Sequence, residues 1–388
     1  MYQELYREAQ AMQDELTTWR HALHQIPERG FDLPQTCAYV QARLTEMGLS
    51  YTTLAESNSI VVELGQGEPC LLLRADMDAL PMREESGEAF ASTNGCMHAC
   101  GHDLHTTFLL GAAKMLKAHE AELKGTVKLL FQTAEELSEG ARSAINHGVL
   151  DNPRVDAAMA AHVYSMYPVG TIAYGEYPAA AFYGFKITLT GKGTHGAMPD
   201  LGIDPINTAV HIYLALQELI ARECPADKQA TLTIGQISAG SAFNIIPETA
   251  FMQGSLRVFD ANLRDHLVKR IGEVIEHVAA AYRTEVTFEL IGDIPALHCD
   301  NALNAQFADV YRQMSPDIAL TPGYKATTSE DFAYVSEHVP TAMFMIGAQV
   351  EEGPVYNLHN PAVRFNDKTL PVGAAVYAAA ALSWQRNE

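Results

Sequence analysis

Apolar and polar positions alternate in different ways along the chain, and the pattern predicts its elements. The first 25 residues carry apolar side chains at helical spacing. Short apolar runs at 59–64, 69–74 and 126–132 are typical of buried strands, and a helical pattern at 106–119 separates the last two. Strands that alternate with helices predict an α/β fold with a central sheet flanked by helices.

From about Phe182 the pattern changes to that of a smaller α+β domain. A strand-like alternation in FYGFKITLTGKG is followed by a helix at 204–222, strands at 230–237 and 250–258, and a helix to about Tyr282. After Asp293 a helix, a turn, a strand at 341–346 and an Ala-rich helix follow. We predict a discontinuous main domain at 1–182 and 294–388 and an inserted domain at 183–293.

Charge narrows the possible partners. The formal net charge of the 388 residues is -21, and Lys and Arg form no cluster that could offset it locally. Such a surface repels phosphates, so we expect no nucleic-acid partner and no binding to anionic lipid.

Three further features predict a soluble cytoplasmic protein. The N-terminal segment is charged and amphipathic, unlike a signal peptide. No apolar stretch reaches the ~18 residues that a membrane-spanning helix needs. The six cysteines are scattered, which indicates reduced thiols rather than a disulfide framework.

Candidate site residues follow the ends of predicted strands. Asp76 and Asp78 follow one strand, Glu135 and Glu136 a second, and His162 a third. Functional sites in open α/β sheets assemble at the carboxyl ends of the strands.

The densest chemistry is the segment His98 to His105, with three imidazoles, a thiol and a carboxylate. Thiolate and imidazole suit a borderline cation such as Zn²⁺, and Gly101 permits the turn that brings Cys100 and His102 to one centre. These two residues are the leading ligand candidates. The alternative is an ordinary helix start capped by Asp103, with the histidines as supporting groups.

The carboxylate pairs have two interpretations each. Glu136 is predicted as a metal ligand and Glu135 as the general base, although a Glu pair at a solvated helix start is the common alternative. We expect Asp78 to orient a ligand imidazole, whereas simple turn chemistry would also place Asp76 and Asp78 after a strand.

With these residues in place, the chain resembles the dinuclear metallo-aminoacylase and carboxypeptidase family. The similarity is to the branch of hippurate hydrolases, N-acyl-amino-acid deacetylases and auxin-conjugate amidohydrolases. Eight segments carry it in order: RADMDALP (74–81), MHACGHDLHT (97–106), QTAEE (132–136), AHVY (161–164), GKGTHGAMP (191–199), AFNIIP (242–247), SEDF (329–332) and LHNP (358–361).

The resemblance implies a ligand set and its metals. It carries the ligands onto Cys100, His102, Glu136, His162 and His359, with the thiolate shared between two divalent ions per subunit. Neither His162 nor His359 stands out locally. Thiolate and imidazole suit Zn²⁺, Co²⁺ or Ni²⁺, and this branch is often associated with Mn²⁺.

The resemblance also assigns roles to the insert. It implies a metal-dependent exopeptidase-like catalytic domain and a lid that commonly forms a homodimer or larger homo-oligomer. His195 would stabilise the oxyanion, in relatives from the partner subunit. Asn244 and Arg257 are predicted to anchor a substrate carboxylate.

The predicted activity is hydrolysis of the N-acyl amide bond of N-acyl-amino acids, of the N-acetyl-amino-acid, N-acetyldiaminopimelate or hippurate type. A metallo-carboxypeptidase or dipeptidase is the alternative enzyme, because the same water attack cleaves peptide bonds. A binding protein on the same scaffold would lack the base or a ligand, but Glu135 and all five ligand positions are present.

Overall fold

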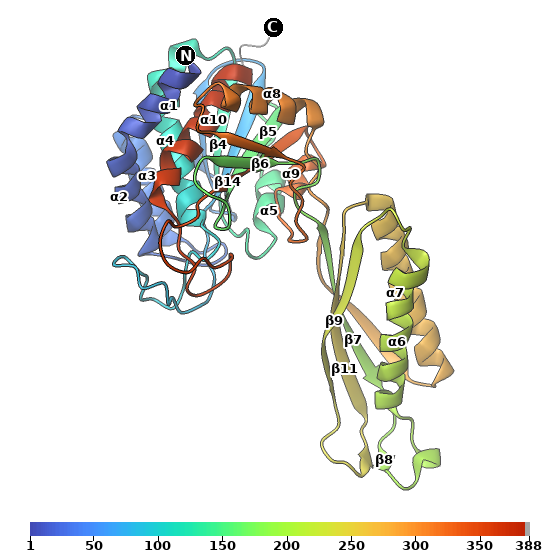
Figure 1. The fold of residues 1–388 in the computed structure, drawn as a ribbon. Helices are drawn as coiled ribbons and strands as arrows, with labels where there is room; N and C mark the ends of the chain where they lie inside the picture. The colour runs from blue at the N-terminus through green and yellow to red at the C-terminus, as the bar shows by residue number, and fades with distance from the viewer. Residues whose placement is uncertain (385–388) are drawn as a thin grey trace. The chain divides into compact units, whose positions relative to one another are not determined.

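The computed structural model describes residues 1–384 and divides into two compact units. The first unit, here the catalytic unit, comprises 1–178, 298–325 and 331–388, of which 385–388 lie outside the described residues. The second, the insert unit, comprises 179–297 and 326–330. Figure 1 shows the order of the elements along the chain.

An eight-stranded mixed sheet forms the centre of the catalytic unit, as the alternating pattern predicts. Its order is β1-β2-β4-β3-β5-β14-β6-β13, with β3, β4, β5 and β14 parallel to one another. The strands are β1 (Tyr51–Thr53), β2 (Ile60–Gly65), β3 (Cys70–Asp76), β4 (Thr126–Gln132), β5 (Ala157–Tyr164), β6 (Thr171–Tyr174), β13 (Ala319–Pro322) and β14 (Thr341–Gly347). Strands β3, β4 and β14 are buried along their whole length.

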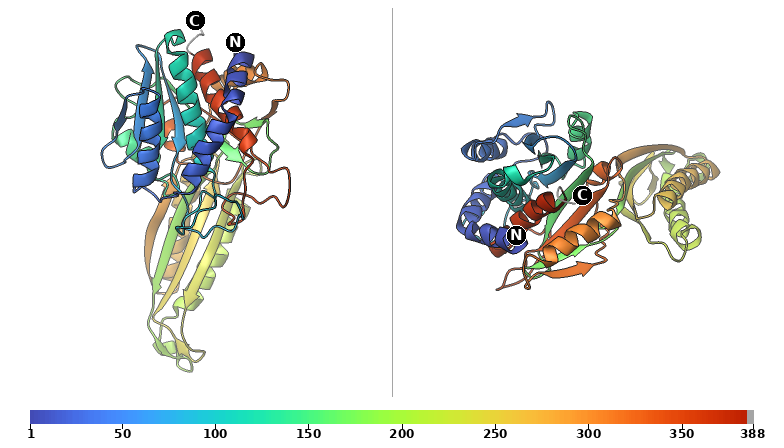
Figure 2. Two further views of the ribbon diagram at one scale, coloured as in Figure 1. Left: turned by 90° about the vertical axis from the view of Figure 1, so that its left-hand side faces the viewer. Right: turned by 90° about the horizontal axis from the view of Figure 1, so that it is seen from above.

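Helices surround this sheet. They are α1 (Tyr2–Ala11), α2 (Gln13–His24), α3 (Pro34–Glu46), α4 (His102–Ala118), α5 (Gly140–Asn146), α8 (Asn301–Arg312), α9 (Ala333–Ser336) and α10 (Leu370–Trp384), with short 3₁₀ helices at Glu120–Glu122 and Asp367–Thr369. Helices α4 (teal) and α10 (red) lie side by side (Figure 2). Their buried side chains join the strands in one hydrophobic core, because neither helix has a solvated face over most of its length.

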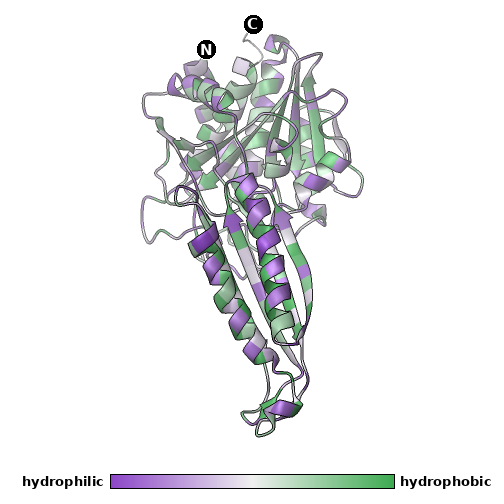
Figure 3. Ribbon diagram, turned by 90° about the vertical axis from the view of Figure 1, so that its right-hand side faces the viewer, coloured by the Kyte–Doolittle hydropathy of each residue, from purple (hydrophilic) through white to green (hydrophobic). Residues whose placement is uncertain are grey.

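The insert unit has its own sheet and core. Strands β7 (Ala181–Thr190), β9 (Ala230–Ala239), β11 (Thr249–Val258) and β12 (Glu285–Ile294) form an antiparallel sheet in the order β12-β7-β11-β9. Helices α6 (Pro205–Glu223) and α7 (Ala261–Ala281) pack on it, and their hydrophobic and hydrophilic positions alternate (Figure 3). A small ribbon of β8 (Thr194–His195) and β10 (Ile245–Ile246), with a 3₁₀ helix at Pro199–Leu201, forms the tip.

Among residues 1–384, no helix combines the length and the apolar character that crossing a membrane requires.

Candidate metal centre

The ligand candidates of the catalytic unit converge from separate elements. Cys100 and His102 flank the start of α4, Glu136 follows β4, His162 lies near the end of β5, and His359 lies in a loop before α10. Several sets of three residues bring one potential ligand atom each to within 4.8 Å of the others. Three of these sets are Cys100–His102–His162, Cys100–Glu136–His359 and His102–Glu135–Glu136. Cys100 belongs to two of these sets, as a shared ligand would.

Gly101 allows the backbone to turn between the two leading candidates. Its φ of 88° lies in the left-handed region, which is the conformation that glycine adopts without steric cost. A Cβ atom at this position would lie 2.3 Å from Cγ2 of Val163. A larger residue would therefore displace the end of β5, which carries His162.

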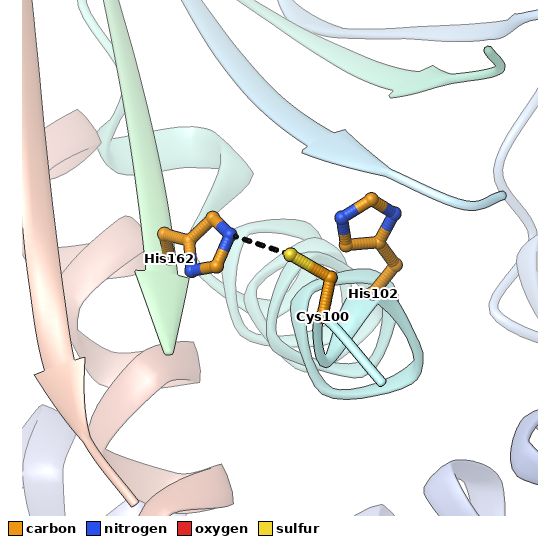
Figure 4. Close-up of side chains that lie close together, drawn as sticks. All are labelled: Cys100, His102 and His162. Atoms are coloured by element: carbon orange, nitrogen blue, oxygen red, sulfur yellow. Dashed lines mark hydrogen bonds between the residues drawn. The ribbon is translucent and has the colours of Figure 1, made fainter. Parts of the chain in front are cut away.

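Cys100 and His162 are already in contact. The thiol Sγ lies 3.4 Å from Nε2 of His162, and Figure 4 shows both side chains with His102. Nδ1 of His162 donates a hydrogen bond of 2.7 Å to the carbonyl of Val163, which leaves the Nε2 lone pair directed at the thiol. A ligand imidazole is commonly fixed in this way through its second nitrogen.

His102 faces carboxylates on both sides of its ring. Nδ1 lies 3.5 Å from Asp78, while Nε2 lies 3.9 Å from both Glu135 and Glu136. The ring is 1% exposed, and neither nitrogen completes a normal hydrogen bond. Buried polar atoms rarely lack a hydrogen-bond partner, and a cation bound to Nε2 would give this nitrogen a partner.

His359 completes the set from a strained loop position. Its φ is 62°, its backbone N–H donates to the carbonyl of Ala99, and Nε2 lies 3.5 Å from Glu136. The ring is about half exposed. The hydrogen bond to Ala99 ties this loop to the Cys100 segment, so the imidazole is held beside the other donors.

The protonation of these groups depends on their burial. Burial, reinforced by the charge of Glu136, raises the pKa of Cys100 well above its ordinary value. Burial opposes a charge on His102, but the negative charge of Asp76 and the neighbouring Asp78 and Cys100 side chains raise its pKa. Thiol, imidazole and carboxylate donors around one point fit divalent transition metals, and a bound cation would favour the thiolate.

Three residues whose roles the sequence left open, Asp76, His105 and Asp103, form buried hydrogen bonds beside this centre. Asp76 accepts a 2.6 Å hydrogen bond from Nδ1 of His105, whose Nε2 accepts from the backbone N–H of Val163. Asp103 is an acceptor for Arg20 and His24 rather than a helix cap. The three-residue spacing of His102 and His105 on α4 is the signal that could have linked His105 to the site.

In the insert unit, Arg257 lies apart from the other two candidate residues. His195 and Asn244 are exposed neighbours at the tip, where Gly196 N–H donates to the carbonyl of Asn244. Arg257 lies near the other end of β11, with its guanidinium 4.4 Å from the Phe182 ring and bonded to Ser329. Eight residues of strand at ~3.4 Å each place Arg257 roughly 27 Å from the tip end of β11. Within one insert unit, Asn244 and Arg257 therefore do not form a common anchor.

Comparison with known proteins identifies the family. The model of peptidase family M20/M25/M40 matches residues 72–383, which is most of the chain and includes every ligand candidate. This chain belongs to that family. The α/β fold and the resemblance found in the sequence are thereby confirmed, and the protein is a metal-dependent M20 amidohydrolase.

Named relatives and a solved structure agree with this assignment. The M20 chain is 38% identical to IAA-amino acid hydrolase ILR1-like 4 of Arabidopsis thaliana, across 93% of the chain and 84% of the relative. It is 35% identical to N-acetyl-L-cysteine deacetylase of Bacillus subtilis, across 92% and 85%. A dinuclear metal-binding peptidase of the M20 family from Bacillus subtilis has a TM-score of 0.82 and 30% identity, covering 96% and 98% of the two chains.

Proposed function

We propose that this M20 amidohydrolase cleaves the N-acyl amide bond of N-acyl-amino acids, with acetyl, benzoyl or similar acyl groups, to a carboxylic acid and an amino acid. The observation that carries the proposal is the convergence of Cys100, His102 and Glu136 with Glu135 beside them. The relatives named for IAA-amino acids and N-acetyl-L-cysteine support an acylated amino acid as substrate.

We assign the metal ligands as Cys100, His102, Glu136, His162 and His359, with Cys100 shared. Two divalent ions, Zn²⁺, Mn²⁺, Ni²⁺ or Co²⁺, would lower the pKa of an attacking water and polarise the acyl carbonyl. Asp78 would orient His102 from 3.5 Å beside Nδ1, and it accepts hydrogen bonds from the backbone N–H groups of Glu135 and Glu136.

Glu135 is the proposed general base. Its carboxylate lies 3.9 Å from Nε2 of His102, and its side chain is 12% exposed, so water can reach it. Glu135 would take the proton of the attacking water and return it to the leaving amine.

His195 is the proposed donor to the tetrahedral oxyanion. Nδ1 accepts a hydrogen bond of 3.1 Å from the backbone N–H of Ala197. This contact favours the tautomer that carries its proton on Nε2, and an exposed Nε2–H can donate to an oxyanion.

The separation of Arg257 and Asn244 favours a substrate site shared between subunits. Arg257 would bind the substrate carboxylate as a bidentate donor, while His195 and Asn244 would come from the partner's tip. A homodimer through the insert unit is supported by two features. Strand β9 lies at the edge of its sheet, and exposed apolar side chains lie on α6 at Ile206, Val210, Tyr213 and Leu214.

We place the enzyme in the cytoplasm, because all six cysteines are free thiols in the structure. A dipeptidase acting on peptide amides is the second candidate, since the same attack by an activated water cleaves peptide bonds.

A parallel assay tests the proposal. N-acetyl-amino acids, hippurate and unmodified dipeptides are supplied at equal concentration to purified protein, with and without a chelator. We expect hydrolysis of an N-acyl-amino acid that the chelator abolishes. Faster cleavage of dipeptides than of any N-acyl-amino acid would instead support the peptidase.

A further inference from the structure

The loop that carries Glu135 and Glu136 is held in an unusual backbone conformation. Ala134 has a φ of 58° and Ser138 a φ of 60°, although neither is a glycine. L side chains rarely adopt the left-handed region, and they remain there only where the surroundings enforce it. Something must therefore fix the loop between the end of β4 and the start of α5.

A single buried carboxylate holds both ends of this loop. The two oxygens of Asp331 accept hydrogen bonds of 2.9 Å from Nε2 of Gln132, the last residue of β4. Oδ2 also accepts a 2.8 Å hydrogen bond from the backbone N–H of Ala141, in the first turn of α5. The loop thus begins and ends on the same side chain.

The ends approach closely enough that glycine is required. A Cβ atom at Gly140 would lie 1.7 Å from the carbonyl oxygen of Thr133 and 2.7 Å from Nε2 of Gln132. Within the loop, Asp78 accepts from the N–H groups of Glu135 and Glu136. Asp331 therefore closes the loop from outside, while Asp78 orders its middle.

Asp331 is itself held rigidly. Oδ1 accepts a 2.8 Å hydrogen bond from Arg74, whose Nε donates to Gln132 and whose Nη1 donates to Asp76. Arg74 is 1% exposed and Asp331 is fully buried. A buried carboxylate with a charged partner and several donors is costly to displace, because removing one partner leaves the other charge unpaired.

We propose that Asp331 is a positioning residue that sets the direction of the Glu135 and Glu136 carboxylates by closing loop 132–141. Asp331 acts through Gln132 and Ala141 and is not among the ligands assigned to the metals. The catalytic consequence rests on the proposed function of Glu135, whereas the closure of the loop can be measured independently of it.

Hydrogen exchange tests the closure directly. Amide exchange of peptides covering 132–141 is compared in the metal-loaded wild type, in Asp331→Asn and in Asp156→Asn. Asp156 is a matched control, because its carboxylate also accepts a backbone N–H, that of Cys70, at the other end of β3. We expect exchange in 134–141 to be at least about tenfold faster in Asp331→Asn alone. Unchanged exchange there, or faster exchange spread evenly over the catalytic unit, would overturn the proposal.

Kinetics of the same variants test the catalytic consequence. At saturating metal, Asp331→Asn should keep two metal ions per chain, lower kcat by about 10- to 100-fold and change KM by less than about threefold. Gln132→Met removes one of the two links through which Asp331 closes the loop, so the double variant should lose no more than Asp331→Asn alone. A kcat equal to that of wild type, or additive losses, would contradict the assignment.

These two readouts separate the possible failures. If Asp331→Asn does not fold, Gln132→Met carries both measurements. If the wild type hydrolyses no N-acyl-amino acid, the proposed function fails, yet loop exchange still decides whether Asp331 closes the loop.

Discussion

Most of the candidate polar residues of the catalytic unit are buried, whereas those at the tip of the insert unit are exposed. Arg74, Asp76 and His102 are each at most 1% exposed and are enclosed by groups of their own unit. At the tip of the insert unit, His195 and Asn244 are exposed, and Phe243, which precedes Asn244 in the AFNIIP segment, is fully exposed. The catalytic unit therefore brings its candidate donors together within one chain, whereas the tip presents exposed groups, which we propose act on a second surface.

The strongest test of the self-contained catalytic unit is Glu135→Gln. The amide keeps the shape of the side chain but cannot accept a proton, so we expect kcat to fall by about 10³-fold or more. Metal content should stay near the wild-type value, because Glu136 and not Glu135 is the proposed ligand. Elemental analysis and initial rates on the same preparation measure both, and retained activity would remove Glu135 from the mechanism.

His195→Ala tests the claim that the tip acts on a second surface. Removing one oxyanion donor should lower kcat by about 10²- to 10³-fold. Because the side chain is exposed, thermal stability and metal content should not change. A drop in Tm that accounts for the lost activity would show that His195 has a structural role.

A mixture of Glu135→Gln chains and His195→Ala chains tests whether His195 acts in its own site or in the partner's. In a dimer with one Glu135→Gln chain and one His195→Ala chain, one of the two sites has both groups intact if His195 acts across subunits. Random pairing should then restore about a quarter of wild-type activity, since half of the dimers are mixed and each has one active site of two. No recovery above the separate variants would place His195 in its own subunit's site.

The smallest expected effect is on the stability of the insert unit alone. Asp260 caps α7 by accepting a hydrogen bond from the N–H of Leu263. Asp260→Ala should destabilise this unit by about 1 kcal/mol, while Asp260→Asn should retain the cap. Differential scanning calorimetry measures this change, and metal content should be equal in both variants. Loss of metal from Asp260→Ala would show that the two units are not independent.

Sequence patterns predicted the α/β fold and singled out the Cys100 segment, because strands, helices and that segment have local signatures. The enzyme class came from the family resemblance that the eight ordered segments carry. They placed the helix around residue 106 and the strand at 126–132 close to α4 and β4. The N-terminal helical pattern is instead two helices, which meet at Met12.

Other parts of the site have no local signature. His162 lies 62 residues from Cys100, and Asp331 lies 257 residues from Arg74. Residues this far apart meet only when the sheet has formed, so spacing cannot reveal the pair. For His162 and His359 the family resemblance supplied what the local pattern lacked. For Asp331 the SEDF segment was recognised, but its contacts with Arg74 and Gln132 required the structure.

The most direct test of the central claim is a metal titration of chelator-treated protein, with amino-acid release from an N-acyl-amino acid as the readout. A dinuclear centre predicts that hydrolysis rises to a plateau at two equivalents of divalent metal per chain. A plateau at one equivalent, or no hydrolysis once two equivalents are bound, would contradict the account.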